Sequence, residues 1–268
     1  HMLIPNLTQI FGILFFGIIL MFSLTVTMFR IVFLLAALTY LFCVIFIFFK
    51  IPITKPTKFE FSYILNIPKD FYVYVLAEMI IILAYALIPT FILFNYLYNI
   101  LNTQIIVIIV IVISANIAGV LGSIVAEKFG GTKGGLLISV FGLSIVHNTF
   151  YFVCLTSTKN IIIVYTILFV FMSYFLRAVW FIYHRAQVYI RIPQNVKGTV
   201  LGSIHSMRTI TWILGPILAS AIAYYMHPLI GFLAAGILFL VDVPVYFAVL
   251  RNKIISLGSQ SKAKKNNS

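Results

Sequence analysis

The chain has 268 residues, of which 63% are hydrophobic and only 9% are charged, and its formal net charge is +13. A lipid bilayer is the only sensible solvent for a chain of this composition, which excludes an ordinary water-soluble domain. The positive charge does not indicate nucleic-acid binding, because the basic residues are spread over several short loops without a stacking platform; topological charge and attraction to anionic lipids explain it.

Eight apolar segments follow one another along the chain. Each approaches or exceeds the about 20 residues that a helix needs to cross a hydrocarbon core of ~30 Å. The expected spans are residues 7–29, 31–49, 71–97, 104–126, 135–156, 161–183, 200–226 and 229–250. The first is too long for a signal peptide and no small-residue cleavage site follows it, so we expect it to stay in the membrane. The sequence thus predicts an all-α polytopic membrane protein.

The basic residues alternate between the gaps. Most of the 18 Lys and Arg residues fall in the gaps 50–70, 127–134 and 184–199 or in the tail 251–268, whereas the opposite gaps hold only Arg30 and Lys159. By the positive-inside rule, the basic gaps and both termini are predicted to be cytoplasmic, in a multi-pass protein of the plasma membrane. The tail, whose lysines lie among Ser, Asn and Gln, is expected to be disordered.

The two cysteines, Cys43 and Cys154, both lie inside predicted spans. There they act most simply as small apolar packing residues. No disulfide or metal spacing is present, so the sequence predicts neither a metal nor a cofactor.

The segment 119–135, GVLGSIVAEKFGGTKGG, joins the fourth and fifth predicted spans. It resembles the cytoplasmic loop signature of the major facilitator superfamily, a small residue followed by an acid, a base, a Gly and further bases. Gly131 and Thr132 stand where the family often has two bases. A Gly-rich turn with incidental charges is the alternative interpretation. The positions that carry the resemblance are Ser123, Glu127, Lys128, Gly130 and Lys133.

The segment 193–220 also resembles that superfamily, through Pro193, Lys197, Gly198, Gly202 and the pair Gly215 and Pro216. A Gly-Pro step inside a span interrupts the helical hydrogen bonds, which a bilayer tolerates where neighbouring helices cover the site or a cavity is lined. Small residues in this span permit close helix approach.

The resemblance implies a domain order. Residues 71–250 correspond to the six-helix second bundle of such a transporter, residues 50–70 to the basic linker, and residues 1–49 to the last two helices of the first bundle. Four helices of the usual twelve are then absent. The third, sixth and seventh spans correspond to helices that line or border the central path, and the fifth and eighth to peripheral ones. Such transporters bind their substrate between the two bundles.

Four ionisable residues lie inside predicted spans at similar depths: Glu78, Arg177, Arg208 and Asp242. A lone charge at the bilayer centre costs at least roughly 2.5–3.5 kcal/mol, so pairing is expected. One hypothesis is that Glu78 with Arg177 or Arg208 forms a network that couples protonation to gating. Structural neutralisation is the simpler alternative. We expect Asp242 to be a packing residue or an anchor between helices.

Further polar or helix-breaking residues lie in the spans. Tyr85 and Pro89 follow Glu78 near the same helix face, so we expect them to line a cavity together with Gly215 and Pro216, and Pro89 to kink its helix. His147 and Asn148 lie near the middle of the fifth span, and Asn116 lies in the fourth. A histidine at this depth suggests a proton relay, but because the resemblance makes the fifth span peripheral, we expect an interhelical hydrogen bond there instead.

The resemblance implies a secondary active transporter, or a fragment of one, that moves an unknown small solute by alternating access, with proton coupling and drug efflux as finer hypotheses. The alternative is a non-transporting truncated paralogue or membrane interaction subunit; missing N-terminal helices or a second copy would complete the path. An enzyme is not expected, because the five acidic residues are scattered and no HExxH, GxSxG or GxxxxGK motif occurs.

Overall fold

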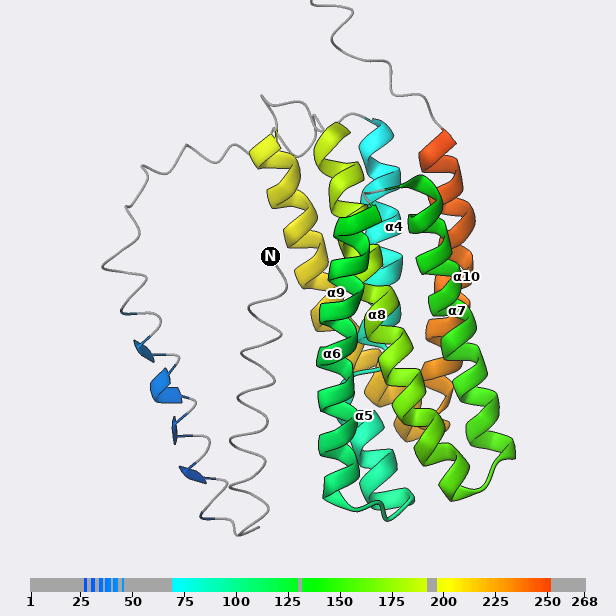
Figure 1. The fold of residues 1–268 in the computed structure, drawn as a ribbon. Coiled ribbons are helices and arrows are strands. Elements are labelled where there is room, and N and C mark those ends of the chain that lie inside the picture. Colours follow the sequence, from blue (N-terminus) through cyan, green and yellow to red (C-terminus); the bar gives the residue numbers. More distant parts are fainter. Residues whose placement is uncertain are drawn as a thin grey trace, which may run out of the picture.

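The structure of the chain is a computed structural model, and it describes residues 69–129, 132–191 and 197–251 together with scattered positions from 27 to 45. Nearly all of the first predicted span, most of the linker 50–70 and the tail beyond residue 251 lie outside the described residues, as do Gly130 and Pro193. Within the described part the chain is helical and has no strand (Figure 1). The described positions from 27 to 45 are also helical.

The helices of the described part follow in the order α4, α5, a π-helical turn η1, and α6 to α10. Six segments, one of which combines α4, α5 and η1, are long and apolar enough to cross a membrane. They coincide with the third to eighth predicted spans within a few residues, except that α8 continues to Arg191. The bounds are α4 Lys69–Ala86, α5 Thr90–Asn95, η1 Tyr96–Ile100, α6 Ile105–Phe129, α7 Lys133–Thr156, α8 Lys159–Arg191, α9 Lys197–Tyr225 and α10 Ile230–Arg251.

The third predicted span is broken at Pro89. Helix α4 ends at Ala86, and Pro89 has an extended backbone (φ −60°, ψ 141°) immediately before α5. A proline lacks an N–H group and disfavours helical geometry in the residue before it, which explains the interruption. The predicted kink is therefore a complete break between two helices of one spanning segment.

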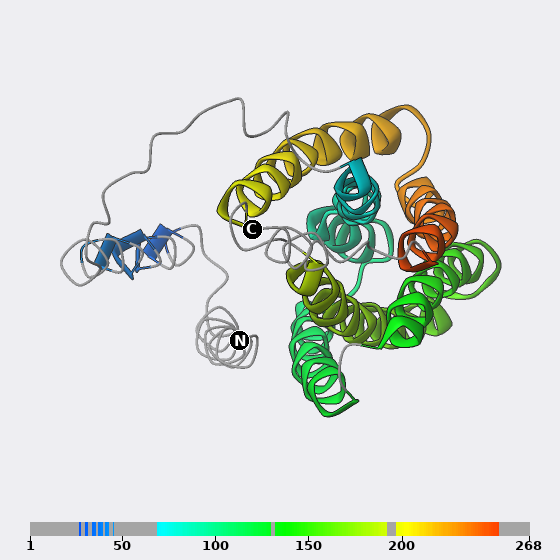
Figure 2. The ribbon, with the colours of Figure 1, turned by 90° about the horizontal axis from the view of Figure 1, so that it is seen from above.

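The long helices pack in an open ring (Figure 2). Helix α6 packs against α8, α8 against α7, α7 against α10, α10 against α4, and α4 against α9. Helices α6 and α9 are the two ends of this series. The inner side of the ring is therefore bounded by α6 at one end and α9 at the other.

Apolar side chains fill the core of the bundle and also lie on its outer surface. Inside, the Phe150 ring stacks on Phe169 with a centroid distance of 4.1 Å and lies 4.8 Å from Phe232, which joins α7, α8 and α10. Outside, Ile138 is 69% exposed and Ile217 is 62% exposed. Outward-facing aliphatic side chains of this kind suit a hydrocarbon solvent, so the bundle has the surface of a membrane protein.

Candidate functional site

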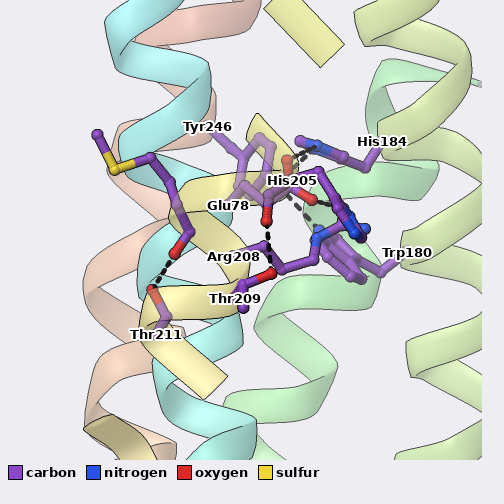
Figure 3. Close-up of polar contacts among 9 residues, drawn as sticks. Glu78, Trp180, His184, His205, Arg208, Thr209, Thr211 and Tyr246 are labelled. Carbon is purple, nitrogen blue, oxygen red and sulfur yellow. Dashed lines mark hydrogen bonds and ion pairs between the residues drawn. The ribbon is translucent and has the colours of Figure 1, made fainter. Parts of the chain in front are cut away.

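A buried polar network joins four helices of the bundle (Figure 3). Glu78 of α4 is 3% exposed, and one carboxylate oxygen, Oε1, forms an ion pair with Arg208 of α9. Its other oxygen, Oε2, lies 3.3 Å from Nε2 of His184 on α8. The carboxylate therefore links three helices through its two oxygens.

The network continues from His184 to α10. Nδ1 of His184 lies 2.7 Å from the hydroxyl of Tyr246, and that hydroxyl accepts a hydrogen bond of 3.0 Å from Nε1 of Trp180. Because the indole N–H only donates, the Tyr246 hydroxyl is free to donate its own proton to Nδ1. Nε2 of a neutral His184 then carries the proton that is donated to Glu78. Every group in this chain of contacts has a compatible donor or acceptor role.

The local sequence explains why these side chains meet. Trp180 and His184 are four residues apart on α8 and so share one helix face, where their rings stack with a centroid distance of 5.2 Å. Sequence reasoning missed both, and Tyr246 as well. It ended the sixth span at residue 183 and so placed His184 in a loop, whereas α8 continues to Arg191. The spacing of Trp180 and His184 was the available signal.

A cavity of about 700 Å³ lies beside this network. The break between α4 and α5, both ends of the helix ring (α6 and α9), and α8 all contribute to its wall. Within the described part of the chain, α7 contributes no lining residue and α10 contributes only Phe232. The polar lining includes Tyr85, Asn116, Ser173, Arg177, Arg208 and Trp212.

Two of the four residues expected to line a cavity do so. Tyr85 and Pro89 contact the cavity, but Gly215 and Pro216 are not among its described lining residues. Helix α9 continues through Pro216, and Gly215 is buried against Ala86 of α4, where an added Cβ would overlap the alanine methyl group. The Gly-Pro step is therefore covered by a neighbouring helix and permits close helix packing.

Arg177 is not the ion-pair partner of Glu78, which was one of the two pairings in the network hypothesis. Its guanidinium carbon lies 4.6 Å from the centroid of the Tyr85 ring and 5.9 Å from that of Tyr174. Among the described residues, the ion pairs of Glu78 are with Arg208 and His184, so Arg208 is the partner and Arg177 is not. Arg177 instead faces the large cavity.

A second, smaller cavity of about 230 Å³ borders the ion pair. Its lining includes Glu78, His184, His205 and Arg208. Arg208 thus lines both cavities, and the Glu78–Arg208 ion pair lies at their junction.

Asn116, His147 and Asn148 form hydrogen bonds within their own helices. Asn116 donates to the carbonyl of Val112 at 2.9 Å, and Nδ1 of His147 lies 2.7 Å from the Leu143 carbonyl. The interhelical hydrogen bond expected at His147 is therefore not formed with a described residue. Asn148 likewise donates to the Ser144 carbonyl four residues earlier on α7.

Asp242 was expected to be a packing residue or an anchor between helices. Its side chain is fully buried, yet neither carboxylate oxygen has a hydrogen-bond partner among the described residues. The expected anchor is therefore not seen in the described part. A buried hydrogen bond from Ser144 to the carbonyl of Gly236, at 2.8 Å, joins α7 to α10.

The described residues of the signature-like loop lie in the last turns of α6 and the first turn of α7. Ser123 is buried and donates to the Gly119 carbonyl at 2.9 Å, while Glu127 and Lys128 are exposed. Thr132, at a position where the superfamily often has a base, caps α7 by accepting from the Gly135 N–H at 3.1 Å. Lys133 donates to the Leu250 carbonyl at 3.3 Å and so joins α7 to the end of α10.

Within the described residues, no group of three or more His, Cys, Asp or Glu side chains is placed to hold a metal ion.

Comparison of the chain with protein-family models, with curated proteins and with solved structures finds no match. The two cavities and the polar network beside them are therefore the features of the described chain that bear on its function.

Proposed function

We propose that this chain is a secondary active transporter of the major facilitator type, or a part of one, that moves a small solute across the plasma membrane by alternating access with both termini in the cytoplasm. The observation that carries the proposal is the large cavity among the helices that are apolar enough to span a membrane. Two arginines and a broken helix contribute to its wall. Charged side chains are retained inside a membrane where they face a cavity or a solute path, because lipid exposure is costly.

The position of the helix break supports this proposal. Pro89 lies well inside the spanning segment Tyr72–Ile100 and lines the cavity. Membrane transporters commonly bind solutes near the bilayer midplane at discontinuous helices, whose free backbone groups are tolerated only where they line a cavity or are covered by protein. A broken helix in the cavity wall is therefore what a solute-binding region requires.

The arrangement of the ring is a second support. The helices that line the cavity correspond to the third, fourth, sixth and seventh predicted spans, and α7 and α10, which contribute little or nothing, correspond to the spans expected to be peripheral. The cavity is bounded by the two ends of an open ring, which is where a partner bundle would close it. We propose that the first two predicted spans belong to that partner bundle, so that the chain has eight spans in all.

The Glu78–Arg208 ion pair is proposed as the gate. It lies at the junction of the large cavity and the smaller one, whose lining residues on α9 lie towards its basic N-terminal end. The positive-inside rule assigns that end to the cytoplasm. Breaking the pair would join the two cavities, and Glu78 would then exchange its proton with water on that side. In this proposal, proton movement and gating use the same carboxylate.

Transport by reconstituted protein tests the proposal. Vesicles that contain the full chain and the entrapped pH dye pyranine are given matched panels of small anionic, neutral and cationic aromatic solutes, with and without a pH gradient. We expect saturable uptake of at least one solute, and a changed pH dependence of that uptake in Glu78→Gln. Tyr224→Phe, a change on the exposed face of α9, is the matched control.

One result would contradict transport itself, and another would contradict only the proton role of Glu78. Vesicles that stay as impermeable to the whole panel as protein-free vesicles would favour the non-transporting membrane subunit. Uptake whose pH profile is the same in the wild type and in Glu78→Gln would remove the proton role of Glu78 while leaving transport in place.

A further inference from the structure

Arg177 is the cation of the large cavity that lacks a carboxylate partner in the described part of the chain. The other lining arginine, Arg208, is paired with Glu78. Of the remaining acidic side chains whose surroundings are described, Glu127 is exposed at the end of α6 and Asp242 does not line the cavity. The described cavity wall therefore contains a positive charge and no Asp or Glu that neutralises it.

The setting of the Arg177 guanidinium leaves its donors available. It lies over the Tyr85 ring at 4.6 Å, and none of its N–H groups donates a hydrogen bond to a described residue. A cation–π contact attracts the guanidinium charge to the face of the ring without using its N–H groups as conventional hydrogen-bond donors. A guanidinium held in this way is prepared to bind a carboxylate or sulfonate with two parallel hydrogen bonds.

The rest of the cavity suits a flat apolar group. Trp180, Phe181, Trp212 and Phe169 contribute aromatic surface, and Asn116 and Ser173 contribute amide and hydroxyl groups. The volume of about 700 Å³ is within the range of sites that hold small organic ligands. Such a lining favours a ligand with an aromatic body and one anionic end.

We propose that the large cavity binds an organic anion with an aromatic body, whose carboxylate or sulfonate is held by Arg177. The inference deepens the proposed function, because it names the class of solute that would be moved. It depends on the cavity and on the free guanidinium, and its test does not require transport.

The chain itself supplies the reporter for this test. It has two tryptophans, Trp180 and Trp212, and both line the large cavity. A bromine atom bound nearby quenches tryptophan fluorescence. Titration of the purified full chain in detergent with 4-bromobenzoate, 4-bromobenzyl alcohol and 4-bromobenzylammonium therefore compares an anion, a neutral molecule and a cation of nearly the same shape in the same cavity.

The expected result is saturable quenching by 4-bromobenzoate with an affinity about tenfold or more above those of its two counterparts, as a charge-assisted hydrogen bond provides. Arg177→Gln should remove that preference while leaving binding of the neutral alcohol unchanged, which shows that the cavity is intact. Arg177→Lys should restore part of the preference, because it keeps the charge but loses the paired donors. Arg185→Gln is the matched control, since Arg185 also lies on α8 over an aromatic ring, that of Phe181, but does not line the large cavity.

Equal quenching by the three probes in the wild type, or an unchanged preference for the anion in Arg177→Gln, would overturn the inference. The outcomes also separate it from the proposed function. Arg177-dependent binding in a protein whose vesicles take up nothing would keep the anion site and reject transport. Saturable uptake of a cationic solute, with no Arg177-dependent binding, would keep transport and reject the anion site.

Discussion

The carboxylate of Glu78 on α4 and the guanidinium of Arg208 on α9 form a buried ion pair at the junction of two cavities. Their side chains are 4% and 17% exposed, so little water remains to solvate either charge once the other is lost. Removing one partner of such a pair costs about 3–5 kcal/mol, because the other charge stays buried and unpaired. We expect Glu78→Gln and Arg208→Gln each to lower the free energy of unfolding in detergent by that order.

The double variant Glu78→Gln with Arg208→Gln tests whether the loss belongs to the pair. Its free energy of unfolding should fall by clearly less than the sum of the two single losses, because it contains no unpaired charge. Additive losses would show that the two side chains do not stabilise each other, and the gate would then have no basis.

Tyr246→Phe removes the hydroxyl that accepts from Trp180 and contacts His184. The buried indole N–H is then left without its partner, which costs about 1–3 kcal/mol. Thermal unfolding measured by circular dichroism should show the loss. Tyr224→Phe, at a position that is 82% exposed, makes the same chemical change and should leave the melting temperature as it is. Equal effects of the two variants would mean that the Tyr246 hydroxyl contributes nothing to the network.

Gly215→Ala places a methyl group where Ala86 of α4 already lies. Overpacking of this kind costs about 1–3 kcal/mol, since one helix must move away from the other. Gly202→Ala on the same helix is the control, because an added Cβ there meets no atom within 4 Å. Alanine is a better helix former than glycine by about 1 kcal/mol, so Gly202→Ala should be neutral or stabilising. A stabilising effect of Gly215→Ala in the same unfolding experiment would contradict the close contact of α4 with α9.

Asp242→Asn should behave differently from Glu78→Gln, although both change one buried acid to its amide. Both oxygens of Asp242 lack a hydrogen-bond partner in the described part of the chain, so the change breaks no described contact. Removing an ionisable group that is buried without a partner relieves a cost. The melting temperature should stay the same or rise. A fall as large as that of Glu78→Gln would reveal a partner for Asp242.

The sequence predicted the spans better than the contacts. Long apolar runs and their polar ends placed the six described spanning segments within a few residues, because hydrophobic length largely determines where a helix enters and leaves a bilayer. The same criterion failed at the end of α8. The polar residues that begin at His184 predict a loop, but polarity ends the membrane span without ending the helix.

The partner of Glu78 could not be chosen from the sequence. Arg177 and Arg208 lie at similar depths, so depth alone permits either ion pair. Which one forms depends on how α8 and α9 are rotated about their axes, and that is set by contacts such as the packing of Gly215 against Ala86. The role of Tyr246 could not be predicted from the sequence, because its hydroxyl contacts Trp180 and His184 only once the helices have packed.

Alternating access is tested most directly at Ser173, a buried residue of α8 that lines the large cavity. Ser173→Cys is made in a chain with Cys43→Ser and Cys154→Ala, and a charged, membrane-impermeant methanethiosulfonate is applied to right-side-out and to inside-out vesicles. Ser139→Cys on α7, which is 1% exposed and does not line the cavity, is the control and should not react from either side. Alternating access predicts that Ser173→Cys reacts from both sides of the membrane. Reaction from one side only, or from neither, would contradict it.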